Sequence, residues 1–96
     1  MDDDALLEEL GRFLIDLGEQ LDMVQEAHRL DQLDEAAERA VYLAEQAERF
    51  GLPPLVAVAN QVADACRRSE RDESRKAIVA LTDVVARVRL GHQVFL

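Results

Sequence analysis

The sequence predicts an all-α protein that folds as an up-down-up-down antiparallel four-helix bundle. Apolar residues recur at steps of three and four along four successive segments, which is the pattern of amphipathic helices. Only short connections separate these segments, which favours antiparallel packing of neighbours. Alternation of apolar and polar residues with a period of two is nowhere sustained, so no strands are expected.

The first helix is expected over residues 3–29. Its apolar stripe consists of Leu7, Leu10, Leu14, Leu17, Leu21 and Val24. The acidic residues 2–4 suit a helix N-terminus, where the helix dipole favours negative charge. Gly11 and Gly18 each cost about 1 kcal/mol relative to Ala inside a helix, but the stripe is long enough to keep the helix intact. His28 falls on the next position of the stripe.

The second helix is expected over residues 34–50, where Asp31 or Asp34 can cap its start. Its stripe is rich in Ala and consists of Ala36, Ala40, Leu43, Ala47 and Phe50. Small side chains let a neighbouring helix approach closely, so this helix is expected at the centre of the bundle. Two pairs have the i,i+4 spacing of helical ion pairs: Glu35–Arg39 and Glu45–Arg49.

The third and fourth helices are expected over residues 54–68 and 73–90. Gly51 suits a left-handed C-terminal cap, and the two prolines that follow end one helix and can begin the next. The polar run 67–75 contains the third connection, and residues 91–96 form a tail. The predicted core combines all four stripes: Leu14, Leu17, Leu21, Ala40, Leu43, Ala47, Val62, Ile78, Leu81 and Val85.

The composition is that of one small globular domain spanning residues 1–96. Hydrophobic residues make up 49% of the chain, too many for a disordered protein. The net charge of −9 disfavours binding to nucleic acid or to an anionic membrane surface. A single cysteine cannot form an internal disulfide. With no apparent signal peptide or membrane span, a cytoplasmic location is expected.

The charge is concentrated in the first half of the chain. Residues 1–50 hold 15 acidic and 4 basic residues, whereas residues 51–96 hold 5 acidic and 7 basic ones. Acidic helix faces can simply keep a small domain soluble. They can also select partners by the sign of their charge.

No residue pattern indicates an active site, a cofactor site or a metal site. His28 continues an apolar stripe, which fits a half-buried structural histidine as well as a functional one. Cys66 lies on the core stripe of the third helix, where a cysteine behaves as a small hydrophobic residue. Tyr42 falls outside the Ala stripe, so it either anchors a partner or lies along its own helix. The chain is therefore not expected to be an enzyme.

The order of these elements resembles the histidine phosphotransfer (HPt) domain of multistep two-component signalling, over nearly the whole chain. The segment from Leu33 to Leu55, LDEAAERAVYLAEQAERFGLPPL, is similar to the family's central segment. In that family a helix carries the phosphorylated histidine and ends about ten residues later in a Gly-x-Pro turn. Here Gly51-Leu52-Pro53 supplies the turn, and counting back ten residues gives Val41 as the acceptor position.

The chemistry of the HPt motif is missing from this chain. The family has His, two variable residues, Lys and then Gly, whereas this sequence has Val41, Tyr42, Leu43, Ala44 and Glu45. An isopropyl group cannot accept a phosphoryl group. The resemblance therefore implies an HPt-like fold without phosphotransfer activity.

The resemblance also implies a partner and a surface. The expected function is a non-catalytic signalling module that docks a response-regulator receiver domain or a sensor histidine kinase. The expected surface lies on the first two helices and consists of Gly18, Asp22, Val41, Tyr42, Glu45 and Glu48.

Two other functions stay open. The chain can be a structural or oligomerisation bundle with no signalling role. It is expected to be a monomer or a weak homodimer, and the exposed tail residues Val94, Phe95 and Leu96 would fit a homodimer. It can also be an active phosphotransfer protein that uses His28. The sequence around His28 departs from the motif, because Asp31 and Gln32 replace its Lys and Gly.

Overall fold

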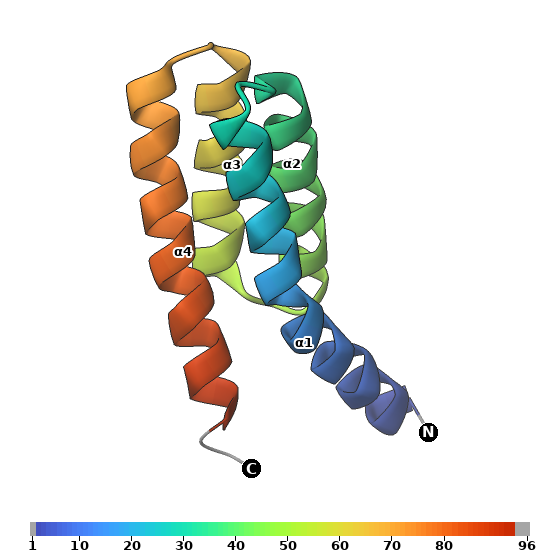
Figure 1. Cartoon of the computed structure of the whole chain (residues 1–96). Coiled ribbons are helices and arrows are strands. Elements are labelled where there is room, and N and C mark those ends of the chain that lie inside the picture. The colour runs from blue at the N-terminus through green and yellow to red at the C-terminus, as the bar shows by residue number, and fades with distance from the viewer. Residues whose placement is uncertain (1, 94–96) are drawn as a thin grey trace.

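The computed structural model describes residues 2–93, which form four helices and no strand within that range. The helices are α1 (Asp2–Arg29), α2 (Leu33–Arg49), α3 (Pro53–Arg67) and α4 (Arg71–Gln93). They run alternately up and down, as Figure 1 shows. Each helix packs against its neighbours in the chain, and α1 also packs against α4 to close the bundle. The predicted all-α four-helix bundle is confirmed.

The residues predicted for the core are buried with a single exception. Nine of the ten residues assigned to it are buried, and Leu14 is only half-buried. Its neighbour Phe13 is buried instead and stacks on Phe50 at the end of α2, with the ring centroids 5.2 Å apart. At this level of α1 the sequence periodicity selected Leu14, whereas the residue that faces the core is Phe13, one position earlier.

The Ala-rich face of α2 is fully packed, as predicted. The buried residues of this helix are Ala36, Ala37, Ala40, Leu43, Ala44 and Ala47. Of all helix pairs in the bundle, α2 and α3 pack most extensively. Methyl side chains leave room for this close approach, so α2 is a central helix of the bundle.

Two of the three turns contain a residue other than glycine in the left-handed region, Asp31 with a φ of 61° and Ser69 with a φ of 55°. Gly51 has a φ of 66° in the remaining turn, which confirms the predicted cap. The predicted capping of α2 by Asp31 or Asp34 is wrong, because Gln32 precedes the helix and no side chain caps it. Asp31 lies in the turn that follows α1, and its carboxylate pairs with Arg71 at the start of α4.

Helix α4 is longer at both ends than predicted. It starts at Arg71 because the polar run supports a helical turn of its own, with i,i+3 ion pairs from Arg75 to Asp72 and from Lys76 to Glu73. At the other end it continues through Gly91 to Gln93, so the first three residues of the predicted tail are helical. Residues 94–96 lie outside the part that the structure describes.

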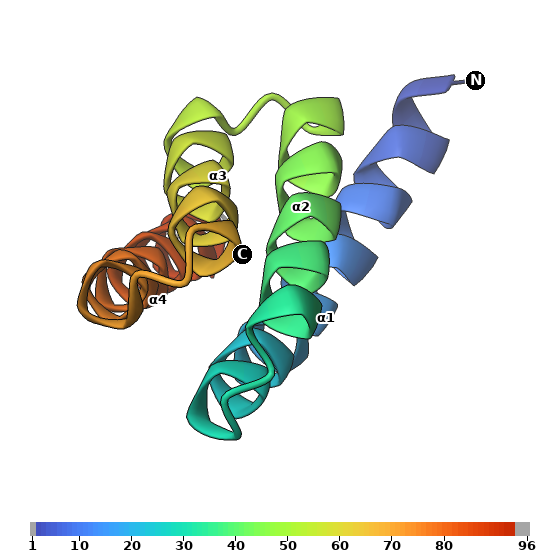
Figure 2. The ribbon, with the colours of Figure 1, turned by 90° about the horizontal axis from the view of Figure 1, so that it is seen from above.

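The first turns of α1 extend beyond the end of α2. Helix α1 has 28 residues and α2 has 17, so α1 is longer by about 16 Å at 1.5 Å per residue. Figures 1 and 2 show its first turns passing the α2–α3 turn and diverging from α4. Leu6 and Leu7 are consequently 49% and 64% exposed.

Gly11 lies on α1 beside the end of α2, and Gly11→Ala is expected to raise the free energy of unfolding by about 0.5–1 kcal/mol. A Cβ atom added there would meet nothing within 4 Å, so the gain in helix propensity is not offset by a clash. Urea denaturation of the two proteins measures the difference. Gly51→Ala is the matched control and should be destabilising, because the φ of 66° strains any residue with a Cβ atom. A Gly11→Ala protein less stable than the parent would contradict the assignment of this segment as an unobstructed helix.

Candidate functional site

The seam between α1 and α2 is open on the outer side of the bundle and forms a continuous groove. Three hollows follow one another along it and share lining residues. Gln20 and Tyr42 line the first and second hollows, and Met23, Glu35 and Arg39 line the second and third. We call this feature the α1–α2 groove. On the other side of α1, a hydrogen bond of 3.0 Å from Gln25 to Thr82 bridges the seam with α4.

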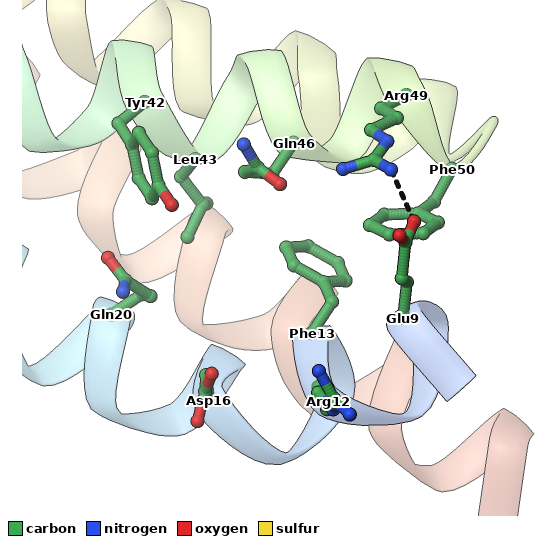
Figure 3. A pocket seen from close by; sticks show the side chains of 10 residues that line it. All are labelled: Glu9, Arg12, Phe13, Asp16, Gln20, Tyr42, Leu43, Gln46, Arg49 and Phe50. Atoms are coloured by element: carbon green, nitrogen blue, oxygen red, sulfur yellow. Dashed lines mark hydrogen bonds and ion pairs between the residues drawn. The ribbon is translucent and has the colours of Figure 1, made fainter. Parts of the chain in front are cut away.

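One end of the groove has an aromatic floor beneath a charged bridge. The hollow there has a volume of 230 Å³, and Phe13 and Phe50 form its apolar base. The Arg49 guanidinium lies 5.4 Å from the centroid of the Phe50 ring and pairs with Glu9 across the seam (Figure 3). The predicted Glu45–Arg49 pair is therefore wrong, because Arg49 reaches the other helix instead.

Tyr42 stands at the middle of the groove. Its side chain extends from α2 toward Gln20 of α1, as Figure 3 shows, and is 50% exposed. The ring therefore overhangs the space between two helices rather than lying along its own helix. An aromatic side chain that is held at a groove and still reachable is suited to contact with a partner.

The remaining charges of the groove are unevenly matched. Arg39 donates a hydrogen bond of 3.2 Å to Glu35, as the i,i+4 spacing predicted, and also contacts the Met23 sulfur at 3.0 Å. Asp16 and Glu38 form no ion pair within the described part of the chain. The groove thus offers two uncompensated carboxylates beside apolar side chains.

The six residues of the predicted docking surface do not form one patch. Tyr42 lines the α1–α2 groove, whereas Glu48 lines a separate hollow beside the α2–α3 turn. Gly18 faces α4, where a Cβ atom would come within 2.8 Å of the Arg89 guanidinium. Val41 is half-buried and packs against the core. The last two members, Asp22 and Glu45, are exposed.

A second cluster of chemically active groups lies at the closed end of the bundle, around His28. Its Nε2 is 2.7 Å from Oγ of Ser74, which is fully buried and donates a hydrogen bond of 2.9 Å to the Arg71 carbonyl. Because the Ser74 hydroxyl directs its proton at that carbonyl, its oxygen is left to accept a hydrogen bond from the Nε2–H of His28. His28 is therefore a half-buried residue that joins α1 to α4.

The surroundings of His28, and of Cys66, whose thiol forms a hydrogen bond with Ser74, favour the uncharged forms of both side chains. Burial, followed by the positive charge of Arg71, lowers the pKa of His28, although Asp31 acts in the opposite direction. Burial also raises the pKa of the Cys66 thiol. A buried protonated thiol is a poor nucleophile. The Cys66 thiol therefore lacks the properties of a reactive nucleophile.

Ser74 is the residue of this cluster that the sequence prediction missed. It lies in a run of charged residues at the start of the predicted fourth helix, and its polarity gave no indication that it would be buried. A sequence clue was present, since Ser74 precedes Ile78 by four positions and therefore extends the stripe formed by Ile78, Leu81 and Val85.

The lowered pKa of His28 predicts that the protein loses stability as the pH falls from about 6.5 toward 5. The unfolded chain binds a proton near the ordinary histidine pKa of about 6.5, whereas the folded chain resists it, so acid favours unfolding. Urea denaturation at pH 7.5 and pH 5.5 measures the loss. His28→Gln keeps an amide donor for Ser74 without titrating, and its stability should change less between the two pH values. An equal loss in both proteins would show that His28 is not responsible.

No metal site or membrane-crossing segment is found in the described region. Among the side chains that the structure describes, no three His, Cys, Asp or Glu residues are grouped so that they could hold a metal ion. None of the helices within residues 2–93 has an apolar stretch long enough to cross a membrane. Comparison of the chain with family models, with curated proteins and with solved structures gave no match.

Proposed function

We propose that this chain is a non-catalytic docking module that binds a protein partner through the α1–α2 groove. The observation that carries the proposal is Tyr42, an aromatic side chain half exposed over a groove with an apolar floor. The resemblance to HPt domains supplies the class of partner, a receiver domain or a sensor histidine kinase of a two-component system. In this proposal Tyr42 is the anchor, and the other predicted surface residues are peripheral.

Two observations favour docking over phosphotransfer. Val41, at the acceptor position that the resemblance implies, has no nucleophilic atom and packs against the core. The nearest alternative, His28, has its Nε2 directed at the buried hydroxyl of Ser74 rather than at solvent. A phosphoryl group transferred to that nitrogen would have to displace this contact.

Binding to purified receiver and kinase domains of the source organism tests the docking proposal. Tyr42→Ala is expected to weaken binding at least tenfold, which corresponds to about 1.4 kcal/mol. Val79→Ala is the matched control, because Val79 is a similarly exposed apolar residue on α4 and lies outside the groove. Equal effects of the two substitutions would contradict the groove as the binding surface, and no binding by any such domain would contradict the class of partner.

The protein is also expected not to accept phosphate from a phosphorylated receiver, and Val41→His alone should not create this activity. Phosphoryl transfer needs positioned positive charge as well as a nucleophile. Ala44, at the position of the HPt lysine, is buried, and Glu45 brings a carboxylate close by. Incubation of parent and variant with a labelled phospho-receiver measures the transfer. Label on the parent protein would contradict the proposal and direct attention to His28, which His28→Gln would then test.

One observation favours oligomerisation as a second candidate function. The N-terminal extension of α1 exposes Leu6 and Leu7, and Leu10 beside them is only half-buried. Apolar side chains gathered on an uncovered helix face can pack against a second copy. A dimeric mass in solution that Leu7→Glu converts to a monomeric mass would support this function.

A further inference from the structure

We infer that the α1–α2 groove receives an amphipathic helix whose polar face is basic and whose apolar face carries a large aliphatic or aromatic anchor. This inference rests on the proposed docking function and names the chemistry of the segment that docks. It is argued from the spacing, the apolar surface and the charge of the groove.

The spacing of the groove residues matches what one helix presents to another. On α2 the lining residues recur at alternating steps of three and four: Glu35, Arg39, Tyr42, Gln46 and Arg49. On α1 the same steps recur: Glu9, Arg12, Asp16, Gln20 and Met23. Each helix thus has a second stripe beside its core stripe, and the stripe on α2 is about 21 Å long. Two antiparallel stripes of this length form a seat for a third helix of about four turns.

The apolar part of the groove suits a large side chain. Tyr42 and the stacked pair Phe13 and Phe50 offer aromatic surface at one end. Met23 lines the next two hollows, and its flexible thioether adapts to partners of different shape. A helix that inserts one aromatic or long aliphatic residue beside Tyr42 would bury this surface.

The charge of the groove selects a basic partner. Five carboxylates and three guanidinium groups line the three hollows. Arg49 and Arg39 are already paired with Glu9 and Glu35, and Glu26 is paired with Arg29 outside the groove. This leaves Asp16 and Glu38 to attract cations and Arg12 to repel them. The first half of the chain, which contains α1 and α2, holds 15 acidic against 4 basic residues, and this charge also disfavours an acidic helix.

Two synthetic helical peptides test the inference. Both carry the same apolar face with one tryptophan, and the polar positions are all lysine in one and all glutamate in the other. In an NMR titration of the ¹⁵N-labelled full chain, the lysine peptide is expected to bind saturably and to shift the amides of Gln20, Tyr42 and Gln46. The glutamate peptide is expected to bind at least tenfold more weakly. Equal affinities, or stronger binding of the glutamate peptide, would overturn the inference.

Matched substitutions separate groove binding from general attraction to an acidic protein. Tyr42→Ala should weaken the lysine peptide at least tenfold, while Val79→Ala should leave its affinity unchanged. Glu38→Gln should weaken it more than Glu45→Gln, which removes the same charge from an exposed position of α2 outside the groove. Shifts spread over all acidic faces, or equal effects of both charge substitutions, would show nonspecific attraction and overturn the inference.

The outcome is distinguishable from that of the proposed function. If the lysine peptide binds in the groove and no receiver or kinase domain does, the chemistry of the groove stands and the proposed class of partner fails. If a receiver or kinase domain binds in a Tyr42-dependent manner and neither peptide binds, the docking function stands and the helix inference fails.

Discussion

Leu17→Ala and Leu81→Ala are each expected to lower the free energy of unfolding by roughly 2–5 kcal/mol. Both side chains have 0% exposure, one on α1 and one on α4, so each substitution removes buried apolar surface and leaves a cavity between helices that cannot fully close. For a domain of this size the loss is a large part of the total stability.

Urea denaturation of the parent and the two variants measures the effect. Leu90→Ala is the matched control, because it makes the same substitution on α4 at a side chain that is 63% exposed. We expect it to change stability by less than about 0.5 kcal/mol, as is usual for surface sites. If both core variants also changed stability by less than that amount, the assigned helix faces would be wrong.

Ala40→Leu and Ala47→Leu are expected to destabilise the protein by about 1–3 kcal/mol for the opposite reason, overpacking. Both alanines have 0% exposure on the face of α2 that packs within the bundle. A leucine at either position adds three carbon atoms where a neighbouring helix already contacts the methyl group, so the helices must separate or the side chain must leave its preferred rotamer.

Thermal unfolding followed by circular dichroism checks this prediction. Ala86→Leu is the control, because Ala86 is an exposed position on α4 where the larger side chain meets solvent. Melting of both α2 variants at or above the temperature of the parent would contradict the central position of this helix.

The helices could be predicted from the sequence because their apolar stripes and turn residues agree. Gly51 and the prolines after it mark one boundary by backbone conformation alone. The ends of α4 could not be predicted in the same way. Charged residues from Arg71 onward form a helical turn through local ion pairs, and polarity does not distinguish such a turn from a loop.

The groove was predictable only in part. Counting residues from the α1–α2 turn gives the height of a residue along the bundle, but not the direction in which its side chain points. Val41 and Tyr42 differ in direction by about 100°, and so one packs against the core while the other overhangs the groove. The Arg49–Glu9 bridge joins residues 40 positions apart and depends on how α1 crosses α2, which no local pattern encodes.

The order of the helices has a consequence for how the chain folds. Each of the three turns has only three residues between helices, at 30–32, 50–52 and 68–70, so little loop entropy is lost when neighbouring helices meet. Among the helix pairs that pack within the described residues, only α1 and α4 are not consecutive in the chain, so their contact closes the longest loop. Topologies dominated by local contacts fold in microseconds to milliseconds. Closure of α1 against α4, with the hydrogen bonds Gln25–Thr82 and His28–Ser74, is therefore the step with the largest cost in loop entropy.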